Sequence, residues 1–174
     1  MVPDIKKILF TTDLSRHSRQ AFEYAVSVAY RYGARLTLLH VMEEMSPSAD
    51  IRLKNFIGQE RWQSIKGSQE EEARQILIGK KREGAVIREA LDEFCERMQT
   101  EAQIDFEIDQ ILVVRGNVVD EILSEAQQNG SDLIVMGYHV RGKLEEAVIG
   151  STTRRLLRRS KIPVMLVQMV EEDG

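Results

Sequence analysis

A group of glycine, basic and hydroxyl residues late in the chain has the types and spacing needed to bind an anion. An apolar run at 133–136 precedes this group, whose members are Gly137, His139, Arg141, Gly142, Gly150, Ser151 and Thr152. Small residues let an anion approach the backbone, and the amides at a helix N-terminus donate hydrogen bonds to it. We therefore expect a phosphate site, and so a nucleotide site. Ser151 or Thr152 could instead only cap the helix that follows, and both interpretations stay open at this point.

Residues 137–143 also spell G-x-x-x-x-G-K, the beginning of a P-loop. The next residue is Leu144, where a P-loop has the Ser or Thr hydroxyl that holds magnesium, and the helical pattern restarts only several residues later. We therefore do not expect a P-loop. Arg141 and Lys143 could offset phosphate charge as mobile cations, or they could be solvated loop residues.

Short apolar runs alternate with helical patterns along the chain. The runs predict strands at 5–10, 36–41, 106–114, 133–136 and 163–167. The helical patterns run from a cap at Ser15 to Gly33, from about 70 to 98, from a cap at Asn117 to Gly130, and from 151 to 160. Almost wholly apolar strands separated by helices indicate one α/β domain over residues 1–174. We expect a five-stranded, mostly parallel open sheet with helices on both faces, Rossmann-like or flavodoxin-like.

In sheets of this kind, ligands bind beyond the carboxyl ends of the strands. Asp13 follows the first predicted strand, Val41 ends the second and Gly137 ends the fourth, so the three meet at this edge. An aspartate here can accept hydrogen bonds from a ribose hydroxyl or an adenine amine, or help to hold a metal. It can equally complete a turn with Ser15. The local sequence does not decide between these roles.

Composition argues against several other classes of function. No apolar run approaches the roughly 20 residues of a membrane helix, and a net charge of −4 argues against a dedicated nucleic-acid binder. The basic run at 154–161 fits a solvated helix face. The single cysteine, Cys95, cannot form an internal disulfide, which fits a reducing cytoplasm, and its helical setting indicates a packing role.

The histidines and the remaining motifs suggest no dedicated catalytic residue. His17, His40 and His139 are too scattered in the sequence to predict a metal site, and His40 fits a hydrogen-bonded core position. Neither a nucleophile elbow nor a His/Cys cluster is present in the sequence.

A long polar excursion at 43–69 follows the second predicted strand. Because it starts at the expected ligand edge, it could be a lid or a surface that binds a protein partner. Its residues Phe56, Ile57 and Trp62 predict packing against another part of the protein. The glycines at 79 and 84 predict a break or bend in the next helix.

The chain resembles the universal stress protein family over essentially its whole length. Nucleotide-binding members of that family carry G-x2-G-x9-G-[ST] after the fourth strand, P-T-D after the first and an L-H-V type sequence in the second. The matching segments here are Thr12-Asp13, Leu39-His40-Val41, Gly137, Arg141-Gly142, Gly150-Ser151 and Lys161-Ile162-Pro163-Val164. The resemblance implies an adenine nucleotide alpha hydrolase-like fold, a site for ATP with or without Mg²⁺, and a homodimer paired through the last strand.

The resemblance also implies roles for individual residues. Asp13 and Val41 would line the adenine and ribose, Gly137 would lie under the ribose and phosphates, and Gly150 with Ser151 would bind the phosphates. His139 matches a family loop position and could contact a phosphate, or it could equally be an exposed surface residue. The other candidate binding residues are Thr12, Arg141, Gly142 and Thr152.

Two positions depart from the family pattern: Thr11 replaces a proline, and Val140 replaces the second glycine. A β-branched residue is strained at positive φ, and its methyl groups would obstruct a phosphate. Two functions follow from the resemblance. The first is a regulator that binds ATP or a related adenine nucleotide, with at most weak hydrolysis or autophosphorylation at Ser151 or Thr152. The second is a nucleotide-free interaction protein in which Val140 closes the site and the excursion binds a partner.

Overall fold

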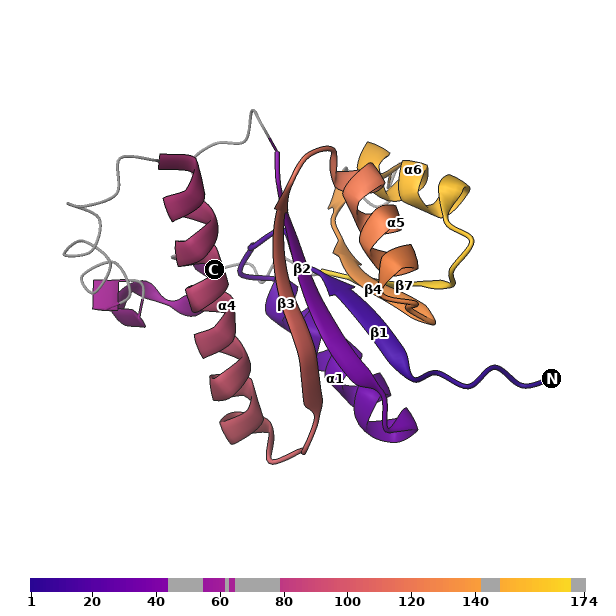
Figure 1. Ribbon diagram of the computed structural model, residues 1–174, viewed down its shortest axis with the longest axis horizontal. Helices are drawn as coiled ribbons and strands as arrows, with labels where there is room; N and C mark the ends of the chain where they lie inside the picture. The colour runs from indigo at the N-terminus through magenta and orange to yellow at the C-terminus, as the bar shows by residue number, and fades with distance from the viewer. Residues whose placement is uncertain (44–54, 62, 65–78, 142–147, 170–174) are drawn as a thin grey trace.

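Five parallel strands form the central sheet of the protein (Figure 1). The structure, a computed structural model, describes residues 1–43, 55–61, 63–64, 79–141 and 148–169. The strands are β1 (Lys7–Thr11), β2 (Arg35–Met42), β3 (Glu107–Arg115), β4 (Leu133–Tyr138) and β7 (Val164–Gln168). Their order in the sheet is β3-β2-β1-β4-β7, and every neighbouring pair is parallel. The predicted fold is confirmed.

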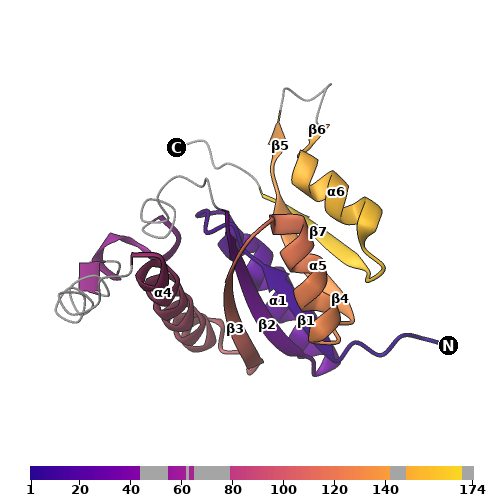
Figure 2. The same ribbon diagram turned by 45° about the horizontal axis from the view of Figure 1, so that its top comes forward.

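Helices cover both faces of the sheet (Figures 1 and 2). The first face carries α1 (Ser18–Tyr32) and α4 (Gly79–Ala102), and the second carries α5 (Val118–Gln128) and α6 (Ser151–Arg159). Strand β2 is an example of why the strands are apolar at nearly every position of the sequence. Its side chains alternate between the faces, so that Leu36 and Leu38 point to the first and Leu39 to the second.

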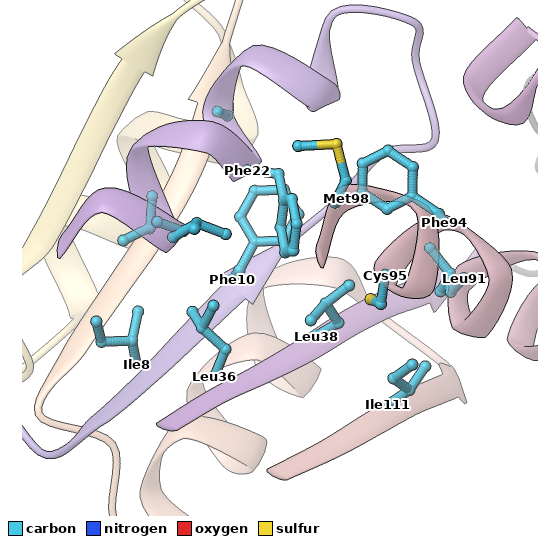
Figure 3. Packing of buried hydrophobic residues seen from close by; sticks show 14 of the residues in the cluster. Ile8, Phe10, Phe22, Leu36, Leu38, Leu91, Phe94, Cys95, Met98 and Ile111 are labelled. Atoms are coloured by element: carbon cyan, nitrogen blue, oxygen red, sulfur yellow. The ribbon is translucent and has the colours of Figure 1, made fainter. Parts of the chain in front are cut away.

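The first face holds the larger core, which is built around aromatic rings (Figure 3). The ring of Phe22 meets those of Phe10 and Phe94 edge to face, with centroids 5.2 and 5.1 Å away. Phe56, from the predicted excursion, lies against Phe94 with a centroid distance of 4.3 Å, and its neighbour Ile57 is also buried. These two residues do pack against the domain, whereas Trp62 lies outside the described residues.

Helix α4 is continuous through Gly84, one of the two glycines at which a break or bend is predicted. The other, Gly79, is the first described residue of the helix. A Cβ at Gly84 would stand 3.4 Å from the Met42 side chain, which is an ordinary van der Waals contact. The predicted start of this helix at about residue 70 lies outside the described residues.

The helix starts correct two predicted caps. Helix α1 has His17, not Ser15, as its N-cap, because the Ser15 side chain makes no capping bond and its carbonyl instead accepts the Ser18 amide at 3.0 Å. Helix α6 has Gly150 as its N-cap and no side-chain cap, so neither Ser151 nor Thr152 caps it.

Two other predicted helix ends agree with the structure, whereas α4 continues to Ala102, beyond the predicted end at 98. Asn117 caps α5, since its side-chain oxygen accepts the amides of Val119 and Asp120 at 3.1 and 3.2 Å. Gly33 ends α1 in the left-handed conformation, at φ 60°.

A short antiparallel pair that the sequence did not predict leads from β4 to α6 (Figure 2). It consists of β5 (Val140–Arg141) and β6 (Val148–Ile149), with Val140 opposite Ile149. This register sets His139 and Gly150 next to each other at the base of the pair. Within the described residues, the helices include none with the length and apolar character needed to cross a membrane.

Candidate functional site

A pocket of about 330 Å³ lies at the carboxyl end of the sheet, where β1 stands between β2 and β4. The strand order reverses at this point, which is where open α/β sheets bind ligands. The predicted site residues that line it are Thr12, Asp13, Val41, Gly137, His139, Gly150, Ser151 and Thr152. The side chain of Arg141 and all of Gly142 lie outside what the structure describes, as does the side chain of Val140.

Asp13 completes the turn that the sequence left open as one alternative, and it also lines the pocket, where the other alternative, ligand binding, would place it. One carboxylate oxygen, Oδ1, accepts hydrogen bonds from the Ser15 amide at 2.9 Å and the Ser18 hydroxyl at 2.6 Å. The other, Oδ2, lies 3.7 Å from Nε2 of His139. Burial raises the pKa of the Asp13 carboxyl, but the hydrogen bonds from Ser18 and Ser15 and the charge of His139 outweigh it, so the pKa is lowered. Asp13 is therefore ionised at neutral pH and acts only as an acceptor.

The turn that presents Asp13 contains a residue in an unusual backbone conformation. Leu14 has a φ of 61°, and its amide donates to the Thr12 hydroxyl at 3.0 Å. A left-handed non-glycine residue costs about 1 kcal/mol. The hydrogen bonds closed by the Thr12 and Asp13 side chains, together with the full burial of Leu14, offset this cost. Such a strained conformation persists only where the surrounding structure holds it. Here the same hydrogen bonds that hold the turn also set the direction of the Asp13 carboxylate.

His40 ties β2 to the end of β1 below this turn. It is 1% exposed, and its Nδ1 lies 2.9 Å from the Thr12 carbonyl oxygen. Since a carbonyl oxygen only accepts, Nδ1 carries the hydrogen. The prediction of a hydrogen-bonded core histidine is confirmed.

The fold brings together two histidines that lie far apart in the sequence. The rings of His17 and His139 have centroids 5.7 Å apart and are nearly perpendicular, at 86°. Nε of Arg16 donates to Nε2 of His17 at 3.1 Å. Sequence spacing gave no signal for this pair, because the β1–α1 loop and the end of β4 become neighbours only in the sheet. A search of the described residues finds no group of three or more side chains able to hold a metal ion.

The first turn of α6 closes the pocket on the side away from β2. The Gly150 carbonyl accepts the amide of Arg154 at 3.0 Å, which begins the helix. Among the described residues, no atom lies within 4 Å of the place where a Cβ of Gly150 would stand. No side chain of that part of the chain caps this end of α6, and the helix dipole favours an anion there.

Several pocket residues were not predicted as site residues. They are Thr11, Ser18, Leu39, His40, Glu43, Val118, Ile122, Met136, Tyr138, Thr153 and Met169. Five of them adjoin a predicted residue in the sequence, namely Thr11, His40, Met136, Tyr138 and Thr153. Ser18, Val118, Ile122 and Met169 come from elements in which no site residue was predicted, and the only sequence signal of Met169 is an apolar type beyond the last strand.

Cys95 has no part in the pocket. It is buried in α4, and burial and the nearby Asp92 and Glu96 carboxylates raise the pKa of its thiol to about 12. It therefore stays a protonated packing residue.

The protein is therefore a single-domain α/β protein with an open parallel sheet and a pocket at the point where the strand order reverses. The model of the universal stress protein family matches residues 4–168, and the chain belongs to this family.

Individual relatives agree with this assignment, and solved structures share the fold. The chain is 26% identical to universal stress protein MJ0577 of Methanocaldococcus jannaschii, over 94% of each chain. It is 28% identical to universal stress protein YxiE of Bacillus subtilis, over 93% of this chain and 98% of that protein. The solved structure of MJ0577 has a TM-score of 0.58 at 24% identity, covering 98% of this chain and 100% of that one. A universal stress protein in complex with cAMP has a TM-score of 0.55 at 19% identity, covering 97% and 100%.

Proposed function

We propose that this protein is a stress-response regulator that binds ATP or a related adenine nucleotide in the pocket at the end of β1, β2 and β4. The observation that carries the proposal is one pocket holding both an ionised acceptor, Asp13, and the uncapped start of α6 at Gly150. A nucleotide needs both, because its hydroxyl and amine groups donate hydrogen bonds while its phosphates accept them.

The wall between these two ends suits a flat, uncharged group. It is lined by apolar side chains of β2, β4 and α5, namely Leu39, Val41, Met136, Val118 and Ile122. A base or sugar packed there would leave the phosphates at α6. Pockets of roughly 300 Å³ and more, mostly apolar with a few convergent polar groups, are typical of small-molecule sites. The family member in complex with cAMP supports an adenine nucleotide as the ligand class.

We propose no dedicated catalytic residue. The Asp13 carboxylate already accepts two hydrogen bonds from its own turn, and Ser151 and Thr152 lie at the start of α6. Hydrolysis or autophosphorylation would therefore be slow. Mg²⁺, where it takes part, would arrive on the phosphates.

We further propose a homodimer in the cytoplasm that pairs through β7. This strand ends the sheet, and it carries the half-buried Val164, Met165 and Leu166. An apolar edge strand is a surface that another strand can cover. Sedimentation velocity at micromolar concentration would give a dimer; a monomer at all concentrations would contradict this part of the proposal.

The test of nucleotide binding is isothermal titration with ATP, with and without magnesium, on wild type and on Asp13→Asn. Asparagine keeps the shape of the side chain but loses its charge, so the affinity should fall about tenfold or more. Asp105→Asn is the matched control, an exposed aspartate before β3 and away from the pocket, and its affinity should stay at the wild-type value. Wild type that takes up no ATP at millimolar concentration would defeat the proposal and favour the nucleotide-free interaction protein.

A further inference from the structure

Gly137 is the glycine at the end of β4, and the atoms around it show why it has no side chain. A glycine is required where φ is positive, where a ligand must approach, or where a neighbour fills the space. Gly137 is absent from the positive-φ glycines of the described chain, so its backbone conformation admits any residue. The space is filled by the protein itself: a Cβ would stand 2.9 Å from both Cγ and Cε of Met169, and closer still to its sulfur.

Met169 is held in this place from two sides. Its amide donates to the Tyr138 carbonyl at 2.9 Å, which continues the β4–β7 pairing one residue past Gln168. Its side chain is 5% exposed and lines the pocket. The backbone of Met169 is therefore held by β4, and its side chain forms part of the pocket wall.

The other motif glycine in the pocket gives the opposite result. A Cβ at Gly150 would meet no atom of the described residues within 4 Å, whereas all three nearest atoms at Gly137 belong to Met169. As far as the structure describes the chain, the space at Gly150 is open and the space at Gly137 is filled by a side chain.

The chemistry of Met169 restricts what can lie against it. A thioether donates no hydrogen bond and is a weak acceptor, so it cannot satisfy a phosphate oxygen. It packs well on apolar and ring surfaces. Along the carboxyl edge, Gly137 and Met169 follow Asp13 in the strand order β1-β4-β7, and the phosphate donors lie at α6.

We propose that Met169 is a specificity-determining wall of the ligand site, that Gly137 serves to admit it, and that the ligand's uncharged sugar packs on this wall. The selectivity part of the proposal rests on the proposed nucleotide function. The Gly137–Met169 relationship does not, and it can be tested without a ligand.

The first test is a double-mutant cycle in thermal stability with Gly137→Ala, Met169→Ala and the double variant. In wild type, the added methyl group overpacks against the thioether, and Gly137→Ala should lower Tm by about 6 °C. In the Met169→Ala background, the same change should cost about 1 °C or less, because the space has been vacated. Gly137→Ala that fails to fold alone but folds together with Met169→Ala gives the same answer.

Gly150→Ala is the matched control for the cycle. It adds the same methyl group to the other pocket glycine, where space is open, so its effect on Tm should be equal in the wild-type and Met169→Ala backgrounds. If Gly137→Ala lowered Tm equally in both backgrounds, the claim that Gly137 makes room for the Met169 side chain would be wrong.

The second test measures ligand selectivity, which a purely structural role would not change. Met169→Ala removes part of the wall and enlarges the pocket beside it. N-methylanthraniloyl-ATP, which carries an aromatic group on the ribose, should therefore gain about fivefold in affinity relative to ATP. Met165→Ala is the control: it truncates a β7 methionine that packs on the first-face core and does not line the pocket. It should lower Tm without changing the affinity ratio.

The two tests separate the failures. An unchanged ratio in Met169→Ala, with ATP still bound, overturns the selectivity proposal alone. Wild type that binds neither nucleotide overturns the proposed function and the selectivity proposal with it, while the stability cycle still decides the role of Gly137. Where neither Gly137→Ala variant folds, the ratio in Met169→Ala decides the proposal.

Discussion

Helices α5 and α6 both begin at the carboxyl edge of the sheet and both contribute to the pocket, yet their starts differ. Helix α5 has its first amides satisfied by the Asn117 side chain at 3.1 and 3.2 Å. Helix α6 starts at a glycine with no side-chain cap and open space beside it. A capped start is complete within the protein, whereas an uncapped start keeps donors for something else. This contrast is the reason that the proposed phosphate site lies at α6 and not at α5.

The strongest way to break this contrast is to cap α6. Gly150 has φ −54° and ψ 154°, an extended conformation that suits a capping aspartate. Gly150→Asp would provide a capping oxygen for the first amides of α6 and place a negative charge at the proposed phosphate site, so the ATP affinity should fall about 100-fold while Tm is kept or slightly raised. Titration calorimetry and thermal melts measure the two effects.

Gly150→Asn separates the cap from the charge in that experiment. It offers a neutral capping oxygen and should weaken ATP binding less than Gly150→Asp does. Wild-type affinity in Gly150→Asp would show that the start of α6 is not the phosphate site.

The converse change removes the existing cap of α5. Asn117→Ala should destabilise the protein by about 1 kcal/mol and lower Tm by about 3 °C. Binding of ATP should change less than twofold, because the cap amides of α5 are not pocket donors. A loss of affinity larger than the loss of stability would contradict the division of roles between the two helices. Urea unfolding with parallel titration measures both.

A smaller effect is expected at the acceptor side of the pocket, where Ser18 holds Asp13. Ser18→Ala removes the 2.6 Å hydrogen bond to the carboxylate and should cost up to about 1 kcal/mol at neutral pH, since the carboxylate is partly exposed. The folded pKa of Asp13 lies below its ordinary value of 3.8. Its contribution is therefore complete above pH 3.8 and is lost as the pH falls through the folded pKa.

The stability difference between wild type and Ser18→Ala should consequently be constant from pH 7 to pH 5 and shrink toward pH 3. Urea unfolding over this pH range measures it. A difference that grows on acidification would assign the Ser18 effect to packing instead of the carboxylate.

The strand and helix pattern could be predicted because the physical cause is local. Strand β2 is apolar on both sides since both faces are covered, and Asn117 and Gly33 act within one turn of their own chain. The pair β5–β6 could not be predicted, because two residues per strand give no periodicity.

The pocket was predictable where the chemistry is carried by one residue and not where it depends on a neighbour. Asp13 and Gly150 are informative by type and position. The meeting of His17 with His139, and of Gly137 with Met169, depends on the order of strands in the sheet, which no spacing along the chain reveals. Gly137 lies in the pocket, as its position after the fourth strand predicts. Its relation to Met169 is visible only in the structure.

Phe56 joins the segment after β2 to the centre of the domain through Phe94, the ring that also meets Phe22 of α1. The Phe94 ring therefore packs against two parts of the chain at once, the domain through Phe22 and the segment after β2 through Phe56. We expect that a shortened chain, with residues 43–69 replaced by a tight linker, would not be an independent smaller version of this fold. It would expose the Phe94 ring to water, and its unfolding would lose part of its cooperativity. Through Phe56, the segment at 43–69 is therefore a structural part of the core and not a removable addition.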